Sequence, residues 1–328
     1  MKKVFNYLSY ILIVSMFLCT FVFILKGKNK EINADSNFKA MCVIDCDSSR
    51  KLYNKDENIK LPMASTTKIV TALTVLNNCN DIDKEFIIDN KAVGIPGTSI
   101  YLKRNEVMTV RELLYGMMLP SGNDAATALA YHISSDIPTF CRLMKQTAER
   151  CGAYNSNFDN PHGLDSLSHY TTAYDLALIT AKALENDIFK EIVTTKSIRI
   201  RGASEGTYRY LKNKNKLLNT LDGCIGVKTG YTGDAGRCLV SACQRDDFRT
   251  VCVVLNCGPM FEESEKYLNM AYGEYRKTIV LPSYKIIRKI SVEQGKKDFV
   301  KTFNKKGFTY PLTEKEMSRI IIKYNLPN

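Results

Sequence analysis

Ser65 and Lys68 are the residues whose type and spacing best suit covalent chemistry. They stand three apart at the start of a predicted helix, just under one turn, so both side chains lie on one face. A lysine whose charge is suppressed by burial or by a nearby cation can take the proton of a serine hydroxyl. The helix N-terminus also offers N–H groups to a developing oxyanion. Alone, the pattern S-x-x-K is weak, because Ser65 could simply cap the helix.

Two further motifs follow in the chain. Ser121-Gly122-Asn123 precedes an Ala-rich segment, and Lys228-Thr229-Gly230 ends a predicted strand. Each one in isolation fits a turn with a helix cap, or a strand end with a turn glycine. An S-x-x-K element, an S-D-N-type element and K-T-G in this order are, however, the combination found in penicillin-binding proteins and class A β-lactamases. Here Gly122 stands at the middle position of the second motif.

Other catalytic sets are absent from the sequence. The chain has three histidines, and it contains no H-E-x-x-H and no P-loop. We therefore predict an enzyme that works without a metal or any other cofactor. His162, between Pro161 and Gly163 in a loop, is interpreted as structural, and His169 is a similarly poor catalytic candidate.

With their flanks, the three motifs resemble the low-molecular-mass D-alanyl-D-alanine carboxypeptidases, the serine penicillin-binding proteins of peptidase family S11. The resemblance covers residues 36–280. It extends to five further segments: Pro62-Met63-Ala64, Gly97–Leu102, Glu112–Gly116, Asn160–Asp165 and Ala235–Val240.

The resemblance implies a role for each residue of the first two motifs. Ser65 would be the acylated nucleophile and Lys68 its general base. Ser121 would relay a proton to the leaving amine, and Asn123 would hold the substrate amide. The substrates implied are peptidoglycan stem peptides ending in D-Ala-D-Ala, and β-lactam antibiotics would be covalent inhibitors of the same serine.

The third motif would bind the substrate. Lys228 would lie near Lys68, keep it neutral and attract the terminal carboxylate of the peptide. Thr229 would hydrogen-bond that carboxylate, and Gly230 belongs to the same substrate-binding strand. Arg237 is a candidate second carboxylate anchor, because a guanidinium matches the geometry of a carboxylate. The N–H groups of Ser65 and Tyr231 would form the oxyanion hole.

The elements that must position these residues run from strand to helices to strands. A strand is predicted over 40–46 and a helix over 64–76. Further helices are predicted over 110–118, 124–133, 139–150, 173–184 and 263–277, and strands over 198–200, 208–211, 226–229, 238–243 and 250–255. This order predicts an α+β fold, an antiparallel sheet flanked by helices plus a mostly helical subdomain. The resemblance makes it β-lactamase/transpeptidase-like.

The N-terminal segment 1–34 is predicted to be a membrane anchor or a signal peptide. Residues 4–25 form an uncharged run long enough to cross a bilayer, with lysines on both sides. Its length favours an anchor, although Ile32-Asn33-Ala34 could serve as a cleavage site. Either way, we expect the rest of the chain on the extracytoplasmic face of the bacterial cell membrane, anchored or secreted into the wall.

The catalytic domain is predicted to span 35–281. The segment 282–328 is short and basic, and it resembles the start of the β-rich second domain that members of the family usually carry in full. The formal charge of the chain is +12, but five lysines flank the N-terminal apolar run, and from residue 31 onward 41 basic against 34 acidic residues leave a net charge of +7. Such an excess suits an anionic surface such as a wall or lipid headgroups, but no basic run with interleaved aromatic residues suggests nucleic acid.

The chain has eleven cysteines, without any C-x-x-C pair. Cys42, Cys238, Cys243 and Cys252 lie in apolar runs, so we interpret them as core residues, and disulfides stay open.

Three alternative functions remain at this point. A β-lactamase would need a separate base for deacylation, and no Glu-x-x-x-Asn occurs between the second and third motifs. A non-enzymatic wall-binding protein is disfavoured by the intact Ser65, Lys68 and Lys228. An endopeptidase or transpeptidase would use the same motifs.

Overall fold

The computed structural model describes residues 21–22, 30–31, 36–291, 293 and 297–324. The predicted anchor therefore lies almost entirely outside the described residues and stays a prediction. Within the described part of the chain, no helix combines the length and apolar character needed to span a bilayer. The chain divides into two compact units, 29–311 and a smaller one formed by 1–28 with 312–328. In the smaller unit, β1 (Phe21–Val22) pairs with β16 (Lys323–Tyr324), and α10 spans Glu314–Met317.

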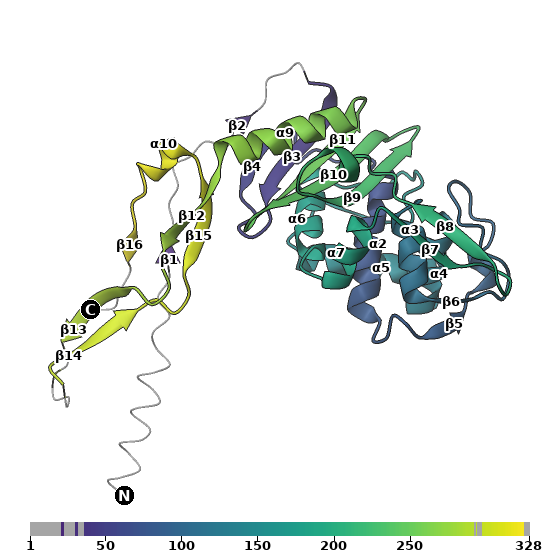
Figure 1. Cartoon of the computed structure of the whole chain (residues 1–328), viewed down its shortest axis with the longest axis horizontal. Coiled ribbons are helices and arrows are strands. Elements are labelled where there is room, and N and C mark those ends of the chain that lie inside the picture. The colour runs from purple at the N-terminus through teal and green to yellow at the C-terminus, as the bar shows by residue number, and fades with distance from the viewer. Residues whose placement is uncertain (1–20, 23–29, 32–35, 292, 294–296, 325–328) are drawn as a thin grey trace, which may run out of the picture. The chain divides into compact units, whose positions relative to one another are not determined.

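A central sheet organises the larger unit (Figure 1). Its order is β2-β4-β3-β11-β10-β9, and every neighbouring pair is antiparallel except β2 and β4. The strands are β2 (Lys30–Glu31), β3 (Phe38–Asp45), β4 (Lys51–Lys55), β9 (Cys224–Thr232), β10 (Gly236–Arg245) and β11 (Phe248–Cys257). β3 and β11 read as continuous apolar runs because both of their faces are buried. Strand β9, which carries Lys228, lies at one edge of the sheet.

Each face of the sheet packs against its own hydrophobic core. Helix α9 (Met260–Glu274) covers one face, where Leu239, Cys243 and Cys252 are buried. The larger core on the other face includes Val240 and Ala242, and Figure 1 shows helices α2 to α7 on that side. They are α2 (Lys68–Asn78), α3 (Val110–Met118), α4 (Asn123–Ile133), α5 (Ile137–Arg150), α6 (Ala173–Ala183) and α7 (Asp187–Thr194). The 3-10 turns are η1 (Ala64–Thr67) and η2 (Asn90–Ala92), and the short helix α8 (Leu217–Thr220) buries Leu217 in the core beside α9. The predicted α+β class is confirmed.

Side-chain caps are found on four of the supporting helices and on neither of the two helices that carry motif residues. Thr109, Asp136, Thr172 and Asn186 cap α3, α5, α6 and α7 with their side chains, each accepting a bond from a main-chain N–H in the first turn. α2 and α4 begin without a side-chain cap. Their first residues are Lys68 and Asn123, so both motif helices start at the candidate site.

Two antiparallel strand pairs accompany the helices, and two more small strand pairs follow the sheet. β5 (Glu85–Ile87) pairs with β6 (Val107–Thr109), and β7 (Ser197–Arg201) with β8 (Tyr208–Lys212). After α9, β12 (Arg276–Leu281) pairs with β15 (Phe308–Leu312), and β13 (Ile286–Ser291) with β14 (Phe299–Phe303). The described part of 282–328 thus contains short strands, and the predicted domain boundaries stay a prediction.

The cysteines predicted to fill the core do so. Cys42, Cys238, Cys243 and Cys252 are fully buried. The ten cysteines among the described residues are free thiols.

Candidate active site

The nucleophile motif lies where a 3-10 turn becomes a helix. The turn η1 places Ser65 one short turn before Lys68, the first residue of α2. Ser65 is half-buried and Lys68 is completely buried. The N-cap residues of the turn and of α2 are Met63 and Thr67 rather than Ser65, and the Oγ of Ser65 lies 2.9 Å from the Lys68 Nζ atom. The two groups therefore face each other as a nucleophile and a base must.

The amine of Lys68 has two further oxygen neighbours. It donates to Asn123 Oδ1 at 2.7 Å and to the carbonyl of His162 at 2.7 Å. A neutral amine can keep both bonds and still offer its lone pair to the serine hydroxyl. Burial, then the charges of Lys228 and Lys214, hold the pKa of Lys68 well below its usual value, against a smaller opposing effect of Asp124. The site thus favours the neutral, proton-accepting form.

Ser121 supplies a second hydroxyl with unusual surroundings. It is buried, and its Oγ has no hydrogen-bond partner among the described residues. Its φ angle is 78°, in the region that favours glycine. Burying an unpaired hydroxyl in a strained backbone is costly, so these features indicate a functional rather than a structural role.

Gly122 and Asn123 form the turn into α4. A Cβ at Gly122 would lie 2.9 Å from Asp124 Oδ1 and 3.0 Å from the carbonyl of Gly116, which explains a glycine in the middle of this motif. Asn123 is buried and is held by the preceding loop. Its main-chain N–H donates to the carbonyl of Thr98 and its Nδ2 to that of Pro96, each at 2.7 Å.

Strand β9 brings the third motif to the same place. Lys228 is buried and donates to the carbonyl of Thr229 at 2.9 Å. Burial, followed by the charge of Lys214, lowers its pKa to about 7. A Cβ at Gly230 would lie 3.0 Å from the nitrogen of Ser65, so only glycine lets the β9 backbone approach the nucleophile this closely. The main chain of β9 therefore lies beside the N–H group of Ser65.

Tyr231 and Arg237 lie further from these contacts. They are partners in the β9–β10 register and both are exposed. By strand alternation they share the α9 face of the sheet, opposite to the face of Lys228. Arg237 donates to the carbonyl of Gly258 at 3.3 Å. The structure does not bring its guanidinium among the contacts of Ser65 and Lys68, and its role as a carboxylate anchor stays a prediction.

His162 and His169 have structural roles at the site. Burial lowers the pKa of His162 to about 3 and that of His169 to about 4, so both are neutral. His169 accepts a bond from the N–H of Asp159 through Nδ1, which leaves Nε2 to donate to Thr67 Oγ1 at 2.8 Å. His162 contributes its carbonyl to Lys68, a role invisible to motif reasoning because every residue has a carbonyl.

Two charged residues near the site, Asp124 and Lys214, were not among the predicted site residues. The buried carboxylate of Asp124 accepts bonds from the N–H groups of Ile100 and Leu102, and it follows directly on the motif asparagine. Lys214 follows β8 and bonds through its N–H to the carbonyl of Leu119 at 3.3 Å, two residues before Ser121. Its proximity to Lys68 could not be inferred from spacing, because the two lysines are 146 positions apart in the sequence and the fold alone joins them.

Comparison with known proteins agrees with this geometry. The family described as peptidase S11, D-alanyl-D-alanine carboxypeptidase, matches residues 26–258. The chain is 31% identical over 269 residues to D-alanyl-D-alanine carboxypeptidase DacF of Bacillus subtilis, and this alignment covers 80% of this chain and 69% of that protein. It is 35% identical over 238 residues to a D-alanyl-D-alanine carboxypeptidase of Streptomyces sp. strain K15, which covers 68% of this chain and 82% of the relative.

Solved structures show the same fold. The crystal structure of DacD, a D-alanyl-D-alanine carboxypeptidase from Francisella tularensis, superimposes with a TM-score of 0.74 at 25% identity, covering 89% of this chain and 84% of the other. A mutant of the Streptomyces K15 DD-transpeptidase gives 0.69 at 30% identity, covering 74% and 100%. The fold and the site define a serine-type hydrolase of the transpeptidase-like class. More specifically, this chain belongs to peptidase family S11, the D-alanyl-D-alanine carboxypeptidases.

Proposed function

We propose that this enzyme removes the terminal D-alanine from peptidoglycan stem pentapeptides through an ester formed on Ser65. The observation that carries the proposal is the buried amine of Lys68, 2.9 Å from the serine hydroxyl and with its pKa well below the usual value. A lysine in that state accepts a proton near neutral pH, which an exposed lysine does not.

Acylation follows from the contacts of the site. Lys68 takes the proton of Ser65 while the Oγ atom attacks the carbonyl carbon between the two D-alanines. The N–H groups of Ser65 and Tyr231 receive the oxyanion. The C–N bond then breaks, and the leaving amine takes a proton through the hydroxyl of Ser121, which has no competing partner among the described residues.

Substrate binding uses the other residues of the motifs. The amide of Asn123 orients the substrate amide, while Lys228 attracts the terminal carboxylate and Thr229 hydrogen-bonds it. Water hydrolyses the ester in a second step and restores Ser65. A β-lactam acylates the same hydroxyl, and its ester persists longer than that of the peptide.

The decisive experiment is mass spectrometry after labelling the purified protein with a penicillin. We expect one adduct, on the peptide that contains Ser65, and neither an adduct nor released D-alanine with Ser65→Ala. A folded wild-type protein that takes no label from a β-lactam or from a D-Ala-D-Ala ester would overturn the proposal. Fast turnover of the penicillin would instead make the enzyme a β-lactamase.

A transpeptidase is the second candidate, since a DD-transpeptidase is among the structures that resemble this chain. Such an enzyme passes the acyl group to an amine instead of water. Product analysis on a pentapeptide with and without an added amine acceptor separates the two: free tetrapeptide supports the carboxypeptidase, and a peptide joined to the acceptor supports the transferase.

The proposed place of action is the extracytoplasmic face of the bacterial membrane, with the N-terminal segment as anchor or signal peptide. Its support is the uncharged run over 4–25 and a substrate that belongs to the wall. Alkaline phosphatase fused after Asn328 should be active in cells. An inactive fusion of full length would contradict this location.

A further inference from the structure

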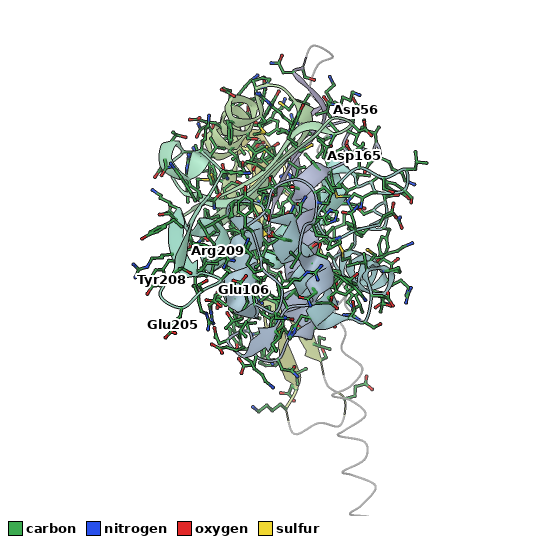
Figure 2. The ribbon with its side chains drawn as sticks, turned by 90° about the vertical axis from the view of Figure 1, so that its right-hand side faces the viewer. Asp56, Glu106, Asp165, Glu205, Tyr208 and Arg209 are labelled. Atoms are coloured by element: carbon green, nitrogen blue, oxygen red, sulfur yellow. The ribbon has the colours of Figure 1, made fainter. Side chains whose placement is uncertain are left out.

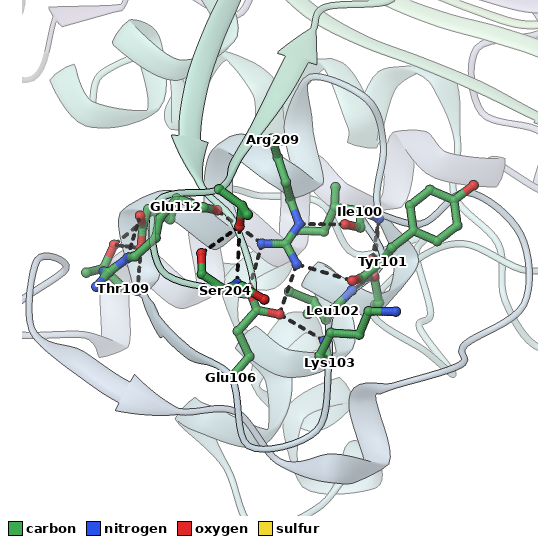
Figure 3. Close-up of polar contacts among 12 residues, drawn as sticks. Ile100, Tyr101, Leu102, Lys103, Glu106, Thr109, Glu112, Ser204 and Arg209 are labelled. Atoms are coloured by element: carbon green, nitrogen blue, oxygen red, sulfur yellow. Dashed lines mark hydrogen bonds and ion pairs between the residues drawn. The ribbon is translucent and has the colours of Figure 1, made fainter.

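A buried ion pair lies outside the three motifs, between the β7–β8 hairpin and the loop that precedes β6. Arg209 of β8 donates from Nη1 to Glu106 Oε1 at 2.6 Å and from Nη2 to Oε2 at 2.9 Å (Figure 3). The side chains are only 13% and 2% exposed. Figure 2 shows the two residues close together on one side of the molecule, away from Asp56 and Asp165. This two-pronged geometry fixes direction as well as distance.

The same guanidinium also holds the backbone of the loop. Its Nε donates to the carbonyl of Ile100 at 2.7 Å and its Nη2 to that of Tyr101 at 3.2 Å. Glu106 in turn accepts a bond from the N–H of Lys103 at 2.8 Å. Arg209 thus holds residues 100–106 from the side of the hairpin. Tyr101 has a φ of 61°, a backbone state that needs such support.

Helix α4 holds the opposite side of this loop through Asp124. The carboxylate of Asp124 accepts bonds from the N–H groups of Ile100 and Leu102 and from the hydroxyl of Ser99. The carbonyl groups of residues 100 and 101 therefore meet Arg209, while the N–H groups of residues 100 and 102 meet Asp124. Arg209 therefore bonds the carbonyl groups and Asp124 the N–H groups, so both side chains are needed to hold both kinds of main-chain group.

The loop carries the carbonyls that orient Asn123. Those of Pro96 and Thr98 hold its side-chain and main-chain nitrogens, and the oxygen of the same amide accepts a bond from Lys68. A chain of direct contacts therefore runs from Arg209 through the loop to Asn123 and on to the catalytic amine.

We infer that Arg209 is a positioning residue that, with Glu106, fixes the loop 96–106 and thereby the amide of Asn123 against Lys68 and the substrate. The inference rests on the proposed function, because it gives Asn123 a part in acylation. Positioning matters because acylation depends on the alignment of reacting groups to a fraction of an ångström.

Arg201 provides a matched control on the same hairpin. Its guanidinium also bonds carboxylates, Glu85 at 2.6 Å and Glu112 at 3.1 Å. Its side chain makes no hydrogen bond or ion pair with residues 96–106 among the described contacts. Arg201→Met removes the same charge and a comparable anchor of the hairpin, but leaves the loop carbonyls with their partner.

The test measures the rate of acylation by a penicillin and kcat and KM for a D-Ala-D-Ala peptide. Arg209→Met should lower the acylation rate about tenfold or more, mainly in kcat, while Arg201→Met stays within about twofold of wild type. Arg209→Lys should restore only part of the rate, because one ammonium cannot serve Glu106 and two carbonyls in a fixed plane.

A second variant separates positioning from stability. Arg209→Met leaves the Glu106 charge buried and unpaired, so it could simply unfold the protein. In the double variant Glu106→Gln with Arg209→Met no charge is left, and the melting temperature should return toward wild type while acylation stays slow. Wild-type acylation in this double variant, or equal losses in Arg209→Met and Arg201→Met, would overturn the inference. A wild-type protein that is not acylated would refute the proposed function instead.

Discussion

Lys228 places a titratable charge at the site in the physiological range. Its pKa is lowered to about 7, by burial and then by Lys214. In the free enzyme, kcat/KM should therefore fall as the pH rises above about 7, because the charge that attracts the substrate carboxylate is lost. Lys228→Arg keeps its charge and should move this alkaline limb beyond the working range. A pH profile of the purified enzyme checks this, and an unchanged limb in the variant would assign it to another group.

The same residue should reduce the stability of the fold. Its pKa in the folded protein is below the ordinary 10.5, so between about pH 7 and 10.5 the unfolded chain holds more protons and the free energy of unfolding rises with pH. Lys228→Met should therefore raise the free energy of unfolding at pH 7 by roughly 1–3 kcal/mol while activity is lost. Denaturant melts at pH 7 and 10 measure this, and the gain should shrink at the higher pH.

Ser121 allows function and stability to be separated in another way. Its hydroxyl has no hydrogen-bond partner among the described residues, so Ser121→Ala removes no contact of the resting fold. We expect the free energy of unfolding to change by about 0.5 kcal/mol or less, so that the melting temperature stays close to that of the wild type. The value of kcat should fall by about 100-fold or more. A variant with intact kcat would remove Ser121 from the proton path.

At the scale of elements, glycines set how closely the loops approach the motifs. A Cβ at Gly97 would lie 2.7 Å from Nδ2 of Asn123, and its φ is 90°. Gly97→Ala should therefore displace Asn123 and slow acylation about tenfold or more. Gly94→Ala is the control, because its φ is 82° but nothing lies within 4 Å of the added carbon. Stopped-flow acylation compares the two, and equal rates would show that backbone strain alone matters.

The motif elements were largely predictable, since local patterns determine them. The helix predicted over 64–76 begins as a 3-10 turn and becomes α2 at Lys68. The closing helix, predicted over 263–277, spans Met260–Glu274: its first turn includes Met260 and Phe261, which pack on the core, and it ends at the extended Tyr275. Strand β9 runs to Thr232, past the predicted end at Thr229, since its pairing with β10 continues to Gly236.

Contacts between distant segments could not be predicted. Nothing in the local sequence joins Arg209 to Glu106, and the alternation of β8 only indicates that Arg209 faces inward, beside Leu211. The hydrogen bond from Lys68 to the carbonyl of His162 requires a glycine at position 163, because a Cβ there would lie 1.9 Å from the carbonyl oxygen of Ala64. Such requirements appear only when the loops have been folded against each other.

At the scale of the whole molecule, the accessibility of the cysteine thiols tests the burial described for the fold. Of the ten described cysteines, seven are buried and only Cys79, Cys151 and Cys224 are partly accessible. Alkylation of the native protein should therefore modify these three, with Cys224 first because its hydrogen bond to Cys243 lowers its pKa. Peptide mapping before and after denaturation checks this. Rapid native labelling of Cys42 or Cys252 would contradict the burial described for the sheet.

The arrangement of the chain has a consequence for when the enzyme becomes reactive. Ser65 and its lysine come early in the sequence, whereas Gly230, whose strand lies against the serine, comes more than 160 residues later. While the polypeptide is still being synthesised, the amine at position 68 is hydrated and retains ordinary basicity, so the neighbouring hydroxyl is no better a nucleophile than any other alcohol. Immature molecules are then inert, and an antibiotic can mark only those that have finished folding.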